Sequence, residues 1–287
     1  MSIKRLAGET AIYGLSSILG RLANFLLLTP FLTRVFPEAE YGVINDLFFY
    51  TAFCIALLVF RLDTAVFRFA SRGDYEPRQV FKVAQCAVMV FVLLFVILGV
   101  GLAPALADWL QYPDRKIYVQ LIVLVVAFDA LSAVPLARLR LLQRAWTFAG
   151  INLANIGLSI VLVFFVLYFA PLWELGWYDE QWMVAYYFGA LLMASVLRYL
   201  LLIGDDWLRN RKQQQQADTR PEVTDQRKSM TKNGLLPGVR LAMLLRYSAP
   251  LVVVALAGIV NSLVGPAMIK FWHGGTVTQN LDWAGYY

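Results

Sequence analysis

Long apolar blocks dominate the chain, and shorter polar connectors separate them. Each of seven blocks has close to, or more than, the roughly 20 residues that an α-helix needs to cross a bilayer. None shows the alternation over ~10 residues that marks a transmembrane β-strand. The pattern therefore predicts an all-α polytopic membrane protein, a transmembrane helix bundle. The blocks run from Thr10 to Val35, Gly42 to Phe60, Val80 to Leu106, Val119 to Leu141, Phe148 to Ala170, Met183 to Ile203 and Leu245 to Phe271.

The lengths of the connectors predict how these helices are arranged. Most connectors are short, which makes consecutive helices antiparallel neighbours in a compact bundle. One connector is long and polar: residues 205–244 contain the run QQQQ and a mixed-charge segment, a composition that buries too little apolar surface to order itself. We expect residues 1–204 to form a six-helix lobe, 205–244 a flexible cytoplasmic linker, and 245–287 the start of a second lobe. A lone helix after such a linker also suggests a fragment of a longer protein.

Lysine and arginine are distributed unequally between the two sides of the predicted membrane. Of the 25 basic residues, eighteen fall on one side and four on the other, with Arg21, Arg61 and Arg198 in or near the membrane. Because basic residues collect on the cytoplasmic side of membrane proteins, we predict a cytoplasmic N-terminus. The net charge of +6 then reflects topology and does not indicate nucleic-acid binding. The first block has no small-x-small cleavage site after it, so we expect a retained helix and not a signal peptide.

Few residues in the sequence point to metal or enzyme chemistry. Cys54 and Cys86 lie inside apolar blocks and are typical packing residues, and His273 has no ligating side chains near it in sequence. We therefore predict no catalytic residue, no metal site and no cofactor. The sequence contains no Walker loop and no HExxH motif, and its outer loops are too short for a catalytic domain. The expected protein is not an enzyme.

The first apolar block has an arginine near its centre. Arg21 lies about 16 Å into the block at the rise of an α-helix. A charge at this depth costs at least about 2.5–3.5 kcal/mol and needs a carboxylate, a hydrated cavity or an anionic ligand. Tyr13, Ser17 and Asn24 share with Arg21 a stripe roughly 80° wide on the helix. We predict that this stripe lines a substrate cavity, and a structural ion pair of Arg21 is the alternative.

Other blocks carry polar residues in weaker patterns. Asn152 and Asn155 share a face of the fifth block, and Asn261 lies in the seventh. Asp129 is the deepest carboxylate, in the fourth block, and Arg61 lies near the cytoplasmic end of the second. All five are candidate cavity residues. In the alternative interpretation the asparagines bond neighbouring helices, Asp129 pairs with an arginine and Arg61 reaches the membrane interface.

Four stretches of the chain resemble one family of transporters. They are GETAIYGLSSILGRLANFLLLTPFLTRVFPEAEYGVINDL, LDTAVFRFAS, PLARLRLLQRAWTFAGINLANI and LLRYSAPLVVVALAGIVNSL. Together with the final GYY, they are similar in order and spacing to bacterial polysaccharide exporters of the O-antigen flippase (Wzx) type. These exporters belong to the multidrug/oligosaccharidyl-lipid/polysaccharide (MOP) exporter superfamily, and the similarity covers essentially the whole chain.

The resemblance implies a fold, a location and a substrate. The fold would be MATE-like, with two six-helix lobes around a central cavity, and this chain would hold the first lobe and the first helix of the second. The protein would lie in the bacterial inner membrane. There it would move an undecaprenyl-diphosphate-linked oligosaccharide from the cytoplasmic to the outer leaflet by alternating access. Arg21 falls where the first-helix cation of such transporters would lie, whereas Gly265 and Pro266 replace an Asp-Arg pair that relatives often carry.

The expected function is thus a lipid-linked oligosaccharide flippase in polysaccharide biosynthesis, such as that of lipopolysaccharide. Its partners would be the lipid-linked glycan, membrane lipid and other polysaccharide-assembly membrane proteins. Arg21 would offset the diphosphate charge, and three asparagines would bond sugar hydroxyls: Asn152, Asn155 and Asn261. The alternatives are a drug or cation antiporter that uses Asp129 or Asp63, a membrane-embedded glycan polymerase or ligase, and an inactive fragment.

Overall fold

The bundle is helical throughout the part of the chain that the computed structural model describes, residues 12–16, 18–20, 22–72, 75–112, 115–174, 176, 178–219, 239–272 and 280. These ranges contain no strand. Seven helical segments within them are long and apolar enough to cross a membrane, which confirms the all-α, multi-pass fold expected from the apolar blocks. They are Ile12–Val35, Glu38–Ser71, Pro77–Gly101, Lys116–Leu141, Ala145–Leu172, Glu180–Arg211 and Leu241–Ser262.

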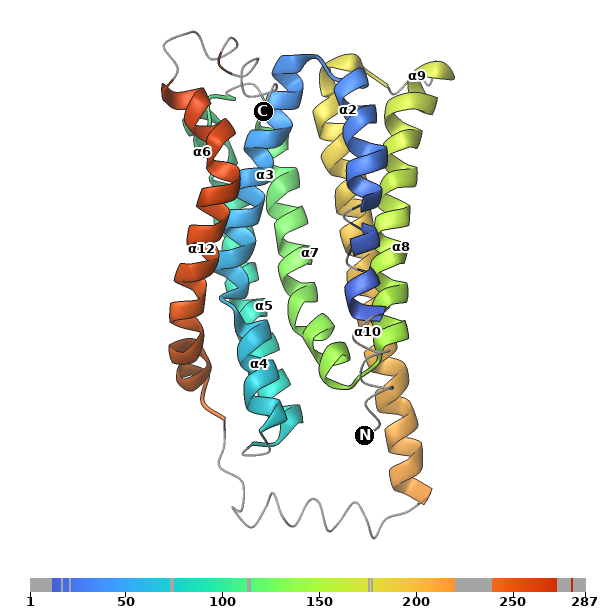
Figure 1. Ribbon diagram of the computed structural model, residues 1–287, viewed down its shortest axis with the longest axis vertical. Coiled ribbons are helices and arrows are strands. Elements are labelled where there is room, and N and C mark those ends of the chain that lie inside the picture. Colours follow the sequence, from blue (N-terminus) through green and yellow to red (C-terminus); the bar gives the residue numbers. More distant parts are fainter. Residues whose placement is uncertain are drawn as a thin grey trace.

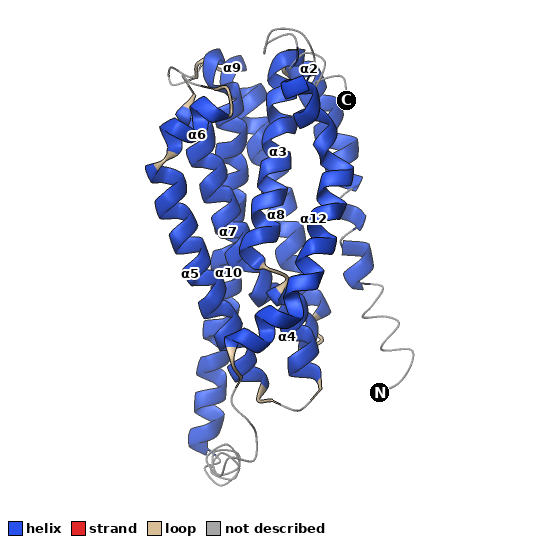
Figure 2. Cartoon of the chain, turned by 90° about the vertical axis from the view of Figure 1, so that its left-hand side faces the viewer, coloured by secondary structure: helices blue, strands red, loops and turns tan. Residues whose placement is uncertain are grey.

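The helices stand roughly parallel to the long axis of the molecule (Figure 2). The chain runs up and down through them, so that consecutive spans are antiparallel, as the short connectors predict (Figure 1). In chain order the elements are η1 (Asn24–Leu28), α2 (Thr29–Val35), α3 (Glu38–Val59), α4 (Leu62–Ser71), α5 (Pro77–Gly101), α6 (Ala103–Trp109), α7 (Lys116–Leu141), α8 (Ala145–Phe164), η2 (Phe165–Phe169), α9 (Ala170–Leu172), η3 (Glu180–Trp182), α10 (Met183–Thr219) and α12 (Leu241–Trp272).

Helix α7 lies at the centre of the bundle and organises its core. It packs against α3, α4, α5, α6, α8 and α10 (Figure 1). Its Tyr118, Val126 and Val134 are almost completely buried. Close approach of α5 to α7 depends on Gly99, since a Cβ at that position would lie 2.7 Å from a methyl group of Val123. A helix surrounded in this way holds its polar residues inside the protein and away from lipid.

The second span is interrupted between α3 and α4. Phe60 and Arg61 both adopt left-handed backbone conformations, with φ of 48° and 52°. This conformation costs a non-glycine residue roughly 1–2 kcal/mol, so tertiary contacts must stabilise it. One such contact comes from α12, where the Ser248 hydroxyl donates a hydrogen bond to the Arg61 carbonyl at 3.2 Å. The seventh span is therefore attached to the second at its point of interruption.

Helix α10 continues beyond the expected end of the sixth span. The sequence places the start of a flexible linker at Asp205, whereas α10 extends to Thr219. Asp205 forms an ion pair with Arg144, and Asp206 forms one with Arg138 at 3.1 Å. These pairs tie this part of α10 to the end of α7 and the start of α8. The glutamine-rich sequence that follows is compatible with a helix.

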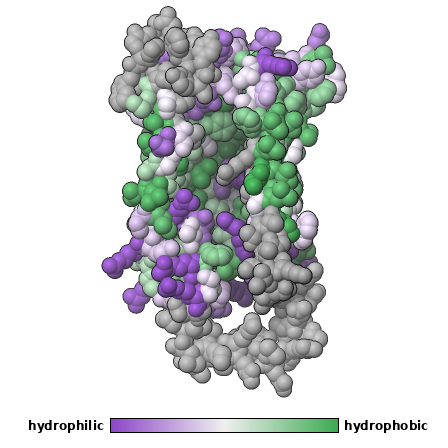
Figure 3. Space-filling view, in the orientation of Figure 1, coloured by the Kyte–Doolittle hydropathy of each residue, from purple (hydrophilic) through white to green (hydrophobic). Residues whose placement is uncertain are grey.

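The surface separates apolar from charged side chains. Large apolar residues of the spans, such as Leu22, Phe25 and Leu93, are more than 40% exposed, as expected of side chains that face lipid. Polar side chains gather toward the two ends of the bundle (Figure 3). We call one end the basic end, because the cations that the sequence predicts to be cytoplasmic lie there. Among the described residues these include Arg68, Arg72, Arg78, Lys82, Arg138, Arg140, Arg144, Arg209 and Arg211.

Candidate functional site

A polar cavity lies inside the bundle, between the first, second, fourth, fifth and sixth spans. Its volume is about 370 Å³. Its lining comes from η1, α2, α3, α7, α8 and α10, and combines apolar side chains with a small set of polar ones. The polar lining residues are Thr29, Tyr41, Asn45, Thr51, Asp129, Asn155, Ser159, Tyr187, Ser195 and Arg198. Polar and charged residues are costly within membrane spans, so a cavity that gathers them is a candidate functional site.

Two residues that line the cavity, one on α7 and one on α10, form an ion pair near the middle of α7. Asp129 of α7 accepts a hydrogen bond from the Arg198 guanidinium of α10 at 2.5 Å. Asp129 lies about 20 Å along α7 from its first residue, near the middle of that helix. The Arg198 side chain is 15% exposed and that of Asp129 is 25% exposed. The two opposite charges reduce each other's cost of burial, which explains how both occupy the centre of a span.

Two polar atoms in the cavity wall have no hydrogen-bond partner among the described residues. One is Nε of Arg198, a donor, and the other is Oδ1 of Asn155 on α8, an acceptor. Both atoms are buried, and a buried polar group without a partner costs roughly 1–3 kcal/mol. The hydroxyl of the neighbouring Ser159 bonds within its own helix, to the Ile156 carbonyl at 2.8 Å. Arg198 Nε requires an acceptor and Asn155 Oδ1 requires a donor, and hydroxyl groups provide both functions.

Aromatic side chains form the wall of the cavity nearer the end opposite the basic end. Tyr187 of α10 and Phe48 of α3 pack edge to face with their ring centroids 6.2 Å apart. Tyr41 of α3 lines the same part. Thr51 does not offer its hydroxyl proton to the cavity, because it donates to the Leu47 carbonyl at 2.8 Å. Apolar ring faces beside a few polar groups are typical of sites for small organic ligands.

The stripe predicted on the first span is only partly described. Arg21 and Ser17 lie outside the described residues, and so does the side chain of Asn24. Tyr13 is described, and its ring packs edge to face on that of Phe148, 5.2 Å between centroids. It belongs to a small apolar cluster with Leu139, Phe148, Ile151 and Leu202 and does not line the polar cavity.

The other candidate residues fall at separate places. Asn155 and Asp129 are brought together in the cavity, whereas Asn152, one turn earlier on α8, does not line it. Asn261 is exposed on α12. The side chain of Arg61 is exposed at the interruption of the second span, where its backbone carbonyl bonds Ser248. Of the six candidate residues whose side chains the structure describes, the cavity therefore gathers two, Asp129 and Asn155.

Asp129 and Arg198 are the charged residues that line this cavity, and Arg198 was not among the candidates from the sequence. The alternative interpretation of Asp129, as the partner of an arginine, is confirmed by its contact with Arg198. A signal was present, since Arg198 is a charged residue within the sixth apolar block. Pairing it with Asp129 required knowing that the fourth and sixth spans are neighbours, and this follows from packing of α7 on α10.

Metal-site geometry and comparison with known proteins add nothing to the description of the cavity. The described residues include no group of three or more His, Cys, Asp or Glu side chains placed to hold a metal ion. Comparison with known protein families, with curated proteins and with solved structures finds no match. The chemistry of the cavity and the sequence resemblance are what remain for a functional proposal.

Proposed function

We propose that this protein is a lipid-linked oligosaccharide flippase of the bacterial inner membrane, with a cytoplasmic N-terminus. It would move an undecaprenyl-diphosphate-linked glycan from the cytoplasmic to the outer leaflet by alternating access. Three things support this proposal: the multi-pass bundle, a polar cavity lined by residues of five spans, and the resemblance of the chain to O-antigen flippases. Other polysaccharide-assembly proteins of the membrane would be its partners.

The observation that carries the proposal is the pair of free polar atoms in the cavity. A sugar hydroxyl can accept a hydrogen bond from Nε of Arg198 or donate one to Oδ1 of Asn155, so hydroxyl groups match both atoms in kind. The volume of about 370 Å³ is near the lower limit for small-molecule pockets, enough for part of a glycan. The polyprenyl tail needs no cavity because the bilayer solvates it.

The ion pair argues against the antiporter alternative. A drug or cation antiporter needs a membrane carboxylate that binds its cation or a proton. In this cavity the Asp129 carboxylate already has a cation, the guanidinium of Arg198, at 2.5 Å. The paired guanidinium cancels the charge of the carboxylate, so the cavity offers no net negative charge to a second cation. A cavity whose two charges are paired with each other favours a neutral, hydroxyl-rich guest.

The test compares two asparagines on the same helix. Asn155→Leu removes an acceptor from the cavity, and Asn152→Leu makes the same change one turn away, outside the lining. Each variant is expressed as the full-length natural gene in the host strain that lacks it. Surface polysaccharide and the leaflet that holds the lipid-linked intermediate are then measured. We expect Asn155→Leu to slow transport about fivefold, since a hydrogen bond contributes roughly 1 kcal/mol.

Arg198→Lys provides a second variant that preserves charge. It keeps a cation opposite Asp129 but removes the free Nε–H, so transport should fall while the protein still inserts normally. Asn152→Leu should transport at the wild-type rate. The proposal is wrong if Asn155→Leu, once correctly inserted, also transports at that rate, or if both variants lose activity equally. It is also wrong if surface polysaccharide is normal in the strain that lacks the gene.

The role expected for Arg21 is tested in the same strain. Arg21→Ala should leave the intermediate on the cytoplasmic side, because no cation would offset the diphosphate charge, while Arg21→Lys should retain part of the activity. If Arg21→Ala inserts normally and supports normal polysaccharide, Arg21 has a structural role only. The glycan part of the proposal, which rests on Asn155 and Arg198, would be unaffected by that outcome.

A further inference from the structure

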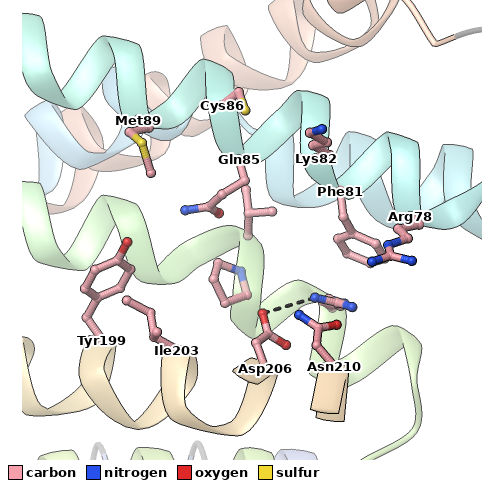
Figure 4. Close-up of a pocket in the computed structure, with 13 residues that line it drawn as sticks. Arg78, Phe81, Lys82, Gln85, Cys86, Met89, Tyr199, Ile203, Asp206 and Asn210 are labelled. Carbon is pink, nitrogen blue, oxygen red and sulfur yellow. Dashed lines mark hydrogen bonds and ion pairs between the residues drawn. The ribbon is translucent and has the colours of Figure 1, made fainter. Parts of the chain in front are cut away.

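A second cavity lies between α5, α7 and α10, toward the basic end of the bundle. Its volume is about 320 Å³. It shares no residue with the polar cavity, and the two cavities use opposite faces of α7. Figure 4 shows its lining: Arg78, Phe81, Lys82, Gln85, Cys86, Met89, Val134, Pro135, Arg138, Tyr199, Ile203, Asp206 and Asn210. Charged and apolar side chains occupy different ends of it.

A proline and a glutamine shape the middle of this cavity. Pro135, inside α7, has no N–H to donate to the carbonyl of Leu131, one turn earlier. The Gln85 side chain of α5 supplies a substitute, because its Nε2 donates to that carbonyl at 3.3 Å. This bond connects α5 to α7 where the proline has interrupted the helical hydrogen bonds. The floor of the cavity is therefore fixed by contacts between helices.

One end of the cavity is cationic. Arg138 is held there by a hydrogen bond to Asp206 at 3.1 Å, and its guanidinium lies 5.4 Å from the centroid of the Phe81 ring (Figure 4). Arg78 and Lys82, one turn apart on α5, are exposed beside it, and neither forms an ion pair with a described residue. Together with the Arg138–Asp206 pair, these two cations give the described lining of this end a net positive charge, which favours an anion.

The other end of the cavity is apolar and open to the surroundings of the bundle. Met89 of α5 is 50% exposed and Ile203 of α10 is 46% exposed. Met89 lies on α5 and Ile203 on the facing helix α10, with Tyr199 near Ile203 (Figure 4). Both residues belong to segments that are long and apolar enough to span a membrane, so we expect this end of the cavity to face lipid acyl chains. The cavity thus runs from a cationic end near the membrane surface to an apolar end within the bilayer.

We infer that this cavity binds an anionic phospholipid from the surrounding leaflet. The lipid phosphate contacts Arg78, Lys82 and Arg138, and an acyl chain lies along Met89 and Ile203. A basic pocket between helices at the membrane surface suits a phosphate headgroup, and the apolar opening suits its chain. A soluble phosphate compound would leave that apolar end without an occupant. The bound lipid connects α5 to α10 around the Arg138–Asp206 pair and stabilises this end of the bundle.

This inference does not depend on the proposed function. It is tested with the purified full-length protein in a neutral detergent, where native mass spectrometry counts bound lipid at increasing concentrations of phosphatidylglycerol or phosphatidylcholine. The wild type should retain phosphatidylglycerol in preference to phosphatidylcholine. Arg78→Gln/Lys82→Gln should weaken phosphatidylglycerol binding about 30-fold, since each basic residue near the membrane surface contributes about 1 kcal/mol.

The matched control removes two charges at the same end of the bundle. Arg72 and Arg140 are exposed and do not line the cavity, so Arg72→Gln/Arg140→Gln should bind phosphatidylglycerol as the wild type does. Equal losses in both double variants would show that surface charge alone attracts the lipid, and would overturn the inference. Equal binding of the two lipids by the wild type would overturn it as well.

A third variant tests the apolar end. Met89→Trp fills the opening while leaving the three cations unchanged, and it should weaken phosphatidylglycerol binding without changing the circular dichroism of the helices. Glycerol 3-phosphate, which has the headgroup charge but no chains, should not displace the lipid at equal concentration. If it does, the cavity is a site for soluble phosphates. If only a polyprenyl diphosphate binds in an Arg78- and Lys82-dependent way, the cavity belongs to the substrate, and the phospholipid assignment is wrong.

Discussion

The ion pair between Asp129 and Arg198 allows a stability prediction that distinguishes its two members. Asp129→Asn preserves the shape of the side chain but leaves the guanidinium of Arg198 without its counterion. A guanidinium does not lose its proton in proteins, whereas a buried carboxylate becomes neutral by binding one. Asp129→Asn should therefore destabilise the protein more than Arg198→Gln does. In Arg198→Gln the carboxylate that remains can bind a proton and become neutral.

The size of the effect follows from the burial of the pair. The two side chains are 15% and 25% exposed, so water screens the pair only in part. At an effective dielectric constant of about 20, opposite charges ~4 Å apart attract by about 4 kcal/mol, and desolvation offsets a share of this. Polar contacts within membrane bundles average near 0.6 kcal/mol, with about 1.7 at the upper end. Because this contact joins two full charges, we expect a coupling energy of about 2 kcal/mol and a loss of about 3 kcal/mol for Asp129→Asn.

The assay is a double-mutant cycle of thermal unfolding in detergent, followed by helical circular dichroism. A loss of about 3 kcal/mol corresponds to a fall of roughly 6–12 °C in Tm for a protein of this size class. Asp129→Asn/Arg198→Gln should unfold at a higher temperature than Asp129→Asn, since no unpaired charge remains. Additive effects of the two changes, or a Tm within about 2 °C of wild type for Asp129→Asn, would refute the reasoning.

Two further predictions concern packing and a buried hydrogen bond. Gly99→Ala should lower the free energy of unfolding by about 1–3 kcal/mol, since the added Cβ would lie 2.7 Å from Val123. Gly101→Ala has open space around it and should leave stability unchanged. Equal melting temperatures of the two variants would contradict this. Tyr112→Phe should cost about 1–3 kcal/mol, because the Tyr112 hydroxyl donates to the fully buried Asp46 at 3.0 Å. Burial, and then the Asp46 charge, raise the pKa of Tyr112 above its usual value near 10. The contribution of Tyr112 to the free energy of unfolding should thus be complete below about pH 10 and decrease as the pH rises further. Unfolding curves at alkaline pH should show a smaller decrease in stability for Tyr112→Phe than for the wild type.

The spans themselves could be predicted from the sequence because their signal is local. A helix in a bilayer satisfies its own backbone hydrogen bonds, so length and hydropathy are enough to locate it. The seven predicted blocks accordingly match the seven spanning segments. The distribution of basic residues is equally local, and it anticipated the gathering of cations at one end of the bundle. The continuation of α10 to Thr219 was missed, because Asp205 and Asp206 find their partners, Arg144 and Arg138, on other helices.

The candidate site was predictable only in part, for a physical reason. Helical periodicity decides which residues share a face, so Asn152 and Asn155 were equivalent candidates in the sequence. Which of them meets a cavity depends on the rotation of α8 against its neighbours, and this is set by packing between residues far apart in the chain. The choice of Arg198 as the partner of Asp129 has the same origin, since it requires α7 and α10 to be adjacent. The sequence by itself thus determined the number of spans and their polar residues, while tertiary structure decided which of those residues face one another.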